Sequence, residues 1–194
     1  MEIIKIIGIS LIGLSTFLML ICLLRKRESF FNLRGVITAH LGLFKNCKIQ
    51  YFIFYGIPLL FASGLAMVYE AGETFFSSLI IIVSILISML LAILSILTTK
   101  DYVSAKNQQQ HAKVRQVVGE TITAIIFSVV LCIFLLLYGL IMVIIGDINF
   151  DINMVKKILA GVSYYSFTVI LLNLLLIVKR ISRIIDNALD ANQD

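Results

Sequence analysis

Five long apolar runs, none of which contains Asp, Glu, Lys, Arg or His, dominate this sequence. Crossing a hydrocarbon core of about 30 Å takes roughly 20 helical residues, and each run is close to that length or longer. The runs are continuous rather than alternating, which excludes a β-barrel, and backbone groups in lipid must be satisfied within their own segment. We therefore predict an all-α polytopic membrane protein in a single domain, with spans Ile6–Leu24, Tyr51–Tyr69, Thr74–Leu97, Thr121–Ile145 and Ile158–Val178.

The composition agrees with this class. The chain is 60% hydrophobic and only 14% charged, whereas soluble domains carry about 25% charged residues. This balance excludes a DNA-binding domain, a disordered tail and a disulfide scaffold. Only Lys5 precedes the first run and Arg25-Lys26-Arg27 follows it, so we expect a retained anchor rather than a cleaved signal peptide.

The basic residues predict the orientation. With the N-terminus outside and the C-terminus inside, 13 of the 16 Lys and Arg residues face the cytosol and 3 face outward. The outer connections 70–73 and 146–157 are short, so we expect spans two and three, and spans four and five, to form antiparallel hairpins. The inner segments 25–50, 98–120 and 179–194 are long enough for a helical cytosolic layer that extends the spans, with an amphipathic helix over residues 30–44.

The spans lack the ionisable groups that intramembrane acid–base chemistry requires. The two histidines, His40 and His111, lie in cytosolic segments, where we expect solvated side chains. The three cysteines show no metal-ligand spacing, and no phosphate-binding glycine loop occurs. We therefore expect a protein that is not an enzyme and that has no cofactor or metal.

Weakly polar residues recur in rows along two spans. Ser77, Ser84, Ser88 and Ser95 fall on one face of span three, and Thr121, Ser128, Cys132, Gly139 and Gly146 recur in span four. Rows of small residues let membrane helices approach closely, so one interpretation is that spans three and four pack together through them. The alternative is a hydroxyl-lined path through an oligomer.

Span five carries the only carboxamide within the predicted spans, Asn173, in a seven-residue row with Ser166 and Arg180. This row is typical of a contact between identical helices, although a bond within the subunit or a polar ring in a pore would use the same residues. In span two, Pro58 follows Gly56 and predicts a kink, which is either a gating hinge or simply shape.

The excess of basic residues in the cytosolic segments has two interpretations. An excess of Lys and Arg is usual inside the membrane, but a phosphate-bearing ligand would also bind there. On position and charge alone, the candidate phosphate contacts are Arg34, Lys45, Lys48, Lys113 and Arg115.

Three stretches together resemble a known kind of protein: His40-Leu41-Gly42-Leu43-Phe44-Lys45, Tyr55-Gly56-Ile57-Pro58-Leu59-Leu60 and Val117-Val118-Gly119-Glu120-Thr121. With the serine-bearing span between them, residues 36–146 are similar to small multi-pass membrane effectors of bacterial antiviral defence, of the Hailong type. The resemblance implies a homo-oligomeric channel in the bacterial inner membrane. It also implies gating from the cytosol by an anionic oligonucleotide made by a neighbouring nucleotidyltransferase.

Two functions therefore stand as expectations. The first is an oligomeric channel or pore-forming effector, whose conduction path includes Ser84, Ser88 and Ser95. The second is a non-conducting membrane subunit or immunity protein that docks a partner through segments 25–50 and 98–120. A small carrier is a weaker third, because its folds often use inverted repeats, whereas the two expected hairpins run in the same direction.

Overall fold

The structure, a computed structural model, describes residues 33–44, 48–69, 71–99, 108–146 and 153–190. Side chains are described for 34–44, 49–69, 71–99, 114–144 and 157–185. The elements are α2 (Leu33–Gly42), α3 (Lys48–Tyr51), the π-helical segment η1 (Phe52–Gly56), α4 (Ile57–Val68), α5 (Glu73–Thr99), α6 (Gln108–Gly146) and α7 (Asn153–Asp190). Over these ranges the fold is all-α with no strand, as predicted.

The chain divides into two compact units, Met1–Gly42 and Leu43–Asp194, and each is described by itself. The first unit contains α2, where the Thr38 hydroxyl donates to the carbonyls of Arg34 and Gly35. This helix ends at Gly42, so it is shorter than the amphipathic helix expected over residues 30–44. The first expected span, 6–24, lies outside the described residues.

Four helices in the described ranges are long and apolar enough to cross a membrane: Ile49–Val68, Glu73–Thr99, Val114–Ile144 and Lys157–Ile185. The first two lie within two residues of the predicted spans 51–69 and 74–97 at each end. The third begins seven residues earlier than predicted and the fourth ends seven residues later, because α6 has 39 residues and α7 has 38. Both helices continue past the apolar run, which confirms helical extensions into segments 98–120 and 179–194.

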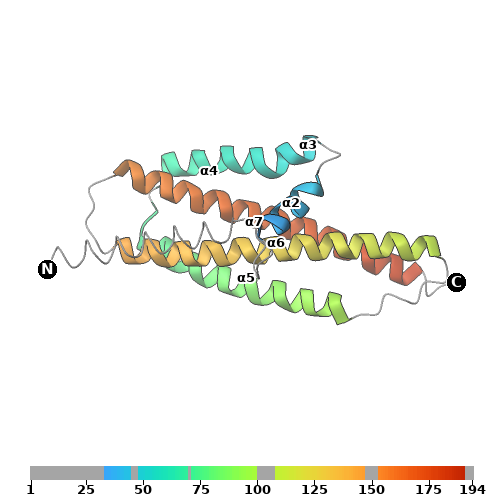
Figure 1. Cartoon of the computed structure of the whole chain (residues 1–194). Helices are drawn as coiled ribbons and strands as arrows, with labels where there is room; N and C mark the ends of the chain where they lie inside the picture. Colours follow the sequence, from blue (N-terminus) through green and yellow to red (C-terminus); the bar gives the residue numbers. More distant parts are fainter. Residues whose placement is uncertain (1–32, 45–47, 70, 100–107, 147–152, 191–194) are drawn as a thin grey trace. The chain divides into compact units, whose positions relative to one another are not determined.

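The four spans of the second unit pack side by side in the order α5, α6, α7, α4 (Figure 1). Helix α6 packs against α5 on one side and α7 on the other, and α4 packs against the far side of α7. The two outer helices of this row, α4 and α5, do not pack along each other.

The connection between α4 and α5 explains this order. Tyr69 leaves α4 in an extended conformation (φ −118°, ψ 127°), and α5 begins only at Glu73. The expected hairpin of spans two and three is therefore not formed as a packed pair, because α7 occupies the flank of α4. The expected hairpin of spans four and five is formed by α6 and α7.

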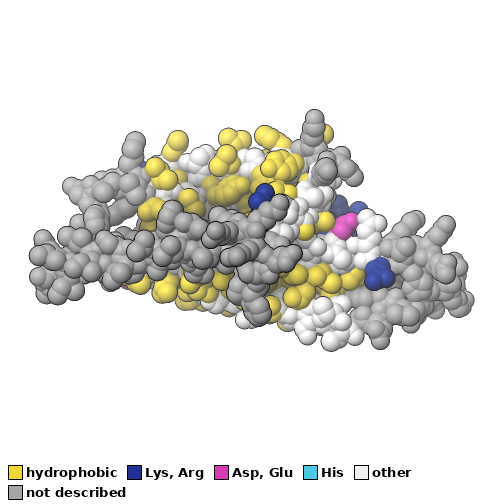
Figure 2. Space-filling view, viewed as in Figure 1, with side chains coloured by type: hydrophobic (Ala, Val, Ile, Leu, Met, Phe, Trp, Pro, Cys, Tyr) yellow, Lys and Arg dark blue, Asp and Glu magenta, His cyan; other side chains and the backbone are white. Residues whose placement is uncertain are grey.

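The exterior of this unit is apolar, as a lipid-facing surface must be. Large side chains are exposed on every span, including Leu60 at 68%, Ile81 at 61% and Leu175 at 67%. Figure 2 shows hydrophobic side chains over much of the described surface on this face, with most charged side chains toward one end. Contiguous apolar exposure on this scale is not tolerated in water and identifies the surface that contacts lipid.

A heptad seam joins α5 to α6. Phe76, Val83, Leu90 and Leu97 recur every seven residues on α5 and are buried in the same core as Leu135 and Met142 of α6. The two helices approach closely at Gly139, where an added Cβ would lie 3.1 Å from Cγ1 of Ile80. The small-residue row of α6 thus lies against α5, as the packing interpretation expected for that helix.

We predict that Gly139→Val weakens the α5–α6 contact, because the new side chain would enter space held by Ile80. Overpacking of this kind costs about 1–3 kcal/mol, which should lower the thermal unfolding midpoint of the detergent-solubilised protein. Gly119→Val is the matched control on the same helix, since a Cβ there meets nothing within 4 Å. Equal effects of the two substitutions would contradict the close approach.

Candidate functional site

A charged clasp joins α6 and α7 at one end of the apolar region, the end that the basic residues predict to be cytosolic. Oε2 of Glu120 lies 3.2 Å from Nη2 of Arg180, and these side chains are 33% and 14% exposed. The second oxygen, Oε1, accepts a hydrogen bond of 3.0 Å from Nε2 of Gln116. Both carboxylate oxygens are therefore engaged, and one of them fixes the position of α7.

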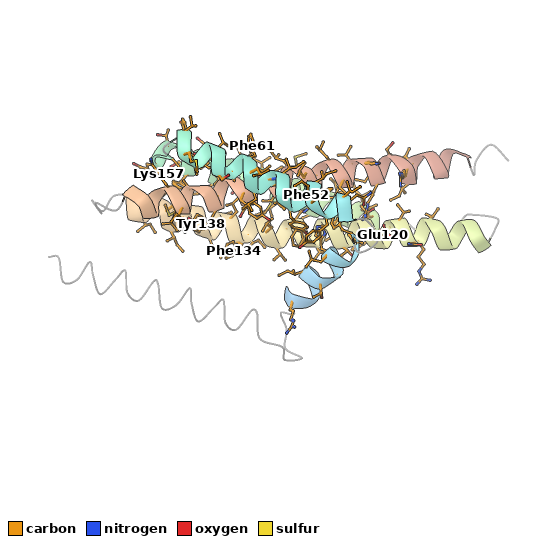
Figure 3. The ribbon with its side chains drawn as sticks, turned by 90° about the horizontal axis from the view of Figure 1, so that it is seen from above. Phe52, Phe61, Glu120, Phe134, Tyr138 and Lys157 are labelled. Carbon is orange, nitrogen blue, oxygen red and sulfur yellow. The ribbon has the colours of Figure 1, made fainter. Side chains whose placement is uncertain are left out.

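A second bond joins the same two helices at the opposite end. The Tyr138 hydroxyl donates to the carbonyl oxygen of Leu159 over 2.7 Å. Figure 3 shows Glu120 and Tyr138 well separated along α6, with the side chains of the apolar region between them. The two contacts together set the antiparallel register of α6 against α7.

Asn173 lies between these contacts, two helical turns from Arg180 and so about 10 Å along α7. Its side chain is fully buried, between Ile170 and Ile177, which belong to the core shared with α5 and α6. Neither amide atom has a hydrogen-bond partner among the described residues. The row Ser166, Asn173 and Arg180 therefore faces the interior of the subunit, so in this arrangement Asn173 is not exposed to a second copy.

The serine row of α5 is exposed, unlike the buried row through Asn173 on α7. Ser77, Ser84, Ser88 and Ser95 are all exposed. At 100° per residue, their face lies about 120° from the face that holds Phe76, Val83 and Leu90. For α5, the interpretation that these serines pack against span four is therefore wrong, because the larger apolar side chains of the heptad seam occupy that contact.

The exposed hydroxyls are partly satisfied by their own helix. Ser84 donates to the carbonyl of Ile80 over 2.8 Å, and Ser88 donates to that of Ser84 over 3.2 Å. Such back-bonding lowers the cost of a hydroxyl in an apolar environment. The face is small and weakly polar, and it lies on an outer helix of the row.

The candidate phosphate contacts are not brought together among the described side chains. Arg34 is exposed on α2 in the first unit, and Arg115 is exposed on α6 in the second. Lys45 lies outside the described residues, and the side chains of Lys48 and Lys113 are not described.

Pro58 follows a local widening of its helix. The N–H of Ile57 donates to the carbonyl of Phe52, an i to i−5 bond, in the segment that immediately precedes Pro58. A Cβ at Gly56 would lie 2.8 Å from the Phe52 ring, so a larger residue there would displace that ring. The sequence predicted a kink at Pro58, and the structure has a π-helical segment directly before this residue, a feature frequently found at functional sites.

His40 is fully buried, so the expectation of a solvated side chain is wrong for this histidine. His111 has no described side chain. Cys132 is a buried free thiol within the α5–α6–α7 core. In the parts of the chain that the structure describes, no group of three His, Cys, Asp or Glu residues could hold a metal ion.

No protein-family model matches this sequence, and comparisons with curated proteins and with solved structures find no match. The class of protein is therefore assigned from the sequence and structure of the chain alone. The chain is a multi-pass α-helical membrane protein with an inner helix pair, α6 and α7, and an exposed serine face on α5.

From the sequence, Arg180 was expected as a cytosolic charge and as a member of the row through Asn173, and Glu120 as part of a motif, but the two were not expected to pair. A signal for their pairing was present, because Glu120 directly precedes span four and Arg180 follows span five by two residues. In an antiparallel pair, these positions lie at the same depth.

We predict that Glu120→Gln destabilises the protein, because it leaves the Arg180 guanidinium without its carboxylate in a largely desolvated position. A hydrogen bond to a charged group contributes about 1.5–3 kcal/mol, and thermal unfolding in detergent would register this loss. A double-mutant cycle with Arg180→Gln should give a clear coupling energy. Glu120→Gln with the exposed Arg183→Gln is the control pair, and equal coupling in both cycles would refute the clasp.

We predict that Asn173→Leu raises the free energy of unfolding, because it replaces two unpaired buried amide atoms by an apolar group of similar volume. A buried polar group without a partner costs about 1–3 kcal/mol. Ser166→Ala, on the same stripe, controls for loss of a hydroxyl there. A lower unfolding midpoint for Asn173→Leu would mean that the amide is hydrogen-bonded in the native membrane protein.

Proposed function

We propose that this protein is a homo-oligomeric membrane channel, with the serine face of α5 directed at the axis shared by several copies. The observation that carries the proposal is the exposure of Ser77, Ser84, Ser88 and Ser95 on the side of α5 away from α6. Acyl chains cannot form hydrogen bonds with a row of hydroxyl groups. Such a row suits either close helix packing or contact with water.

The order of the helices supports several copies rather than one. The four described spans form a row whose outer helices, α4 and α5, do not meet along their lengths, so they enclose no conduit. Because α5 lies at one end of this row, its serine face is accessible to a neighbouring copy. Hydroxyl side chains and their backbone carbonyls offer both donors and acceptors to a permeating, partly hydrated ion.

In this proposal, the channel is gated from the cytosolic side. The extensions of α6 and α7 carry basic side chains, of which Arg115 and Arg183 are exposed, and the Glu120–Arg180 clasp lies at their base. An anionic ligand bound to these extensions would act directly on the two helices that the clasp joins. The unpaired amide of Asn173 supports a second arrangement of α6 and α7 in which that group finds a partner.

The ligand and setting follow from the resemblance noted above. They are an oligonucleotide made by a neighbouring nucleotidyltransferase, the inner membrane of a bacterium, and an antiviral effector that depolarises its host. The protein is not an enzyme in this proposal, and its effect is ion flow.

The proposal predicts a pattern of water access along α5. In a background without Cys22, Cys47 and Cys132, Ser84→Cys and Ser88→Cys should react with a membrane-impermeant thiol reagent in conducting liposomes. Met89→Cys is the matched control, because Met89 is 56% exposed but lies off the serine face. We expect the serine positions to react about tenfold faster or more, since a thiol reacts as its thiolate, which does not form in lipid.

Ion flux from the same liposomes is measured in parallel, together with the mass of the intact detergent-solubilised assembly. Labelling at Ser84 and Ser88 should reduce the flux, and labelling at Met89 should not. A monomeric mass with tight liposomes would reject the channel and favour the non-conducting membrane subunit.

A further inference from the structure

A groove of about 540 Å³ runs between α4 and α7, on the opposite side of α7 from the helix α6. Its lining includes the small residues Ala62, Ser63, Ala66 and Gly161. A Cβ added to Gly161 would lie 3.5 Å from Cβ of Ala66, an ordinary contact, so alanine fits at this position but a larger side chain would extend into the groove. Its volume falls within the range of about 300–1,000 Å³ that is common for small-molecule sites.

The lining is mostly apolar, and its polar members are Ser63, Tyr165 and, at one end, Lys157. Larger apolar side chains, Leu59, Met67 and Ile158, complete the walls, and the groove is open along one side. Both helices are long and apolar enough to span a membrane, so the opening lies at the depth of the acyl chains. The Ser63 hydroxyl donates to the Leu60 carbonyl over 2.9 Å, so an acyl chain in the groove leaves this group hydrogen-bonded.

Lys157 is the only charged residue in the lining. Its side chain is exposed, and in the sequence it directly precedes the apolar run that begins at Ile158, which places it at the level of the lipid headgroups. Figure 3 shows Lys157 near the end of α7, where α4 also ends. A lysine at this depth extends its ammonium group to the interface, where phosphates lie.

The geometry points to a binding site for an anionic phospholipid, with one acyl chain in the α4–α7 groove and the headgroup at Lys157. The chain alone does not select a lipid, because acyl chains are as apolar as the side chains they would touch. Selection comes from the charge, since Lys157 attracts an anionic headgroup more strongly than a zwitterionic one. The site is independent of the serine face of α5 and does not rest on the proposed channel.

The test is a titration of the purified full-length protein in detergent with phosphatidylglycerol or phosphatidylcholine, read as retained lipid by mass spectrometry of the intact protein. We expect a preference for phosphatidylglycerol that Lys157→Gln reduces about fivefold, the equivalent of about 1 kcal/mol for one lysine near the membrane surface. Lys179→Gln, at the other end of the same helix, makes the same charge change on another exposed lysine and should leave the preference intact.

The groove itself is tested by filling it. Gly161→Leu should reduce the retention of both lipids, whereas Gly161→Ala should fit and retain them. Equal losses from Lys157→Gln and Lys179→Gln would overturn the site, because they would reduce it to general surface charge. Unchanged retention in Gly161→Leu would equally overturn it. Lys157→Gln alters only an exposed side chain, so its result stands even if the groove variant is unstable.

Discussion

The packing of α6 against α7 is the contact on which the rest of the second unit depends. These are the two inner helices of the row, so α5 is held through α6 and α4 through α7. Inside a bilayer, no hydrophobic force drives helices together, and specific bonds must fix which residues face each other. Here, the Tyr138–Leu159 hydrogen bond and the Glu120–Arg180 clasp do so near the two ends of the apolar region.

Two kinds of polar group in the apolar region differ in burial and in hydrogen bonding. The hydroxyls of α5 lie on an exposed face, and those of Ser84 and Ser88 bond back to their own helix. The amide of Asn173 is buried among aliphatic side chains without a partner in the described residues. The first arrangement is inexpensive and leaves a surface available to other copies. The second is costly, because a buried polar group without a partner has lost its hydrogen bonds to water.

The sequence predicted the four described spans well, because length and the absence of charge decide membrane insertion without reference to any other helix. It did not predict which face of each helix packs. On α5, the serine row and the row Phe76, Val83 and Leu90 both have the spacing of a contact surface, and only the partner helix decides between them. The row through Asn173 was expected at an interface between copies, but it faces the core of its own subunit. In a chain that is apolar on all sides, periodicity identifies contact faces without naming the partner.

The candidate site was predicted only in part, for related reasons. The irregularity at Pro58 could be foreseen because proline removes a backbone donor from a helix. Its form, a π-helical segment with the Phe52 ring over Gly56, depends on side-chain packing that no local rule gives. The basic residues were selected by charge, but charge does not bring Arg34 and Arg115 together when they belong to different compact units.

The length of α6 has a mechanical consequence. With 39 residues it measures about 58 Å, roughly twice the hydrocarbon thickness, and α7 is nearly as long. Each helix is continuous over its whole length, so no joint would absorb a sideways push at the end that extends past Glu120 or Arg180. The protruding ends would act as stiff levers that pivot close to these two residues. A small displacement far from the bilayer would tilt the buried halves of both helices together and carry α5 and α4 with them.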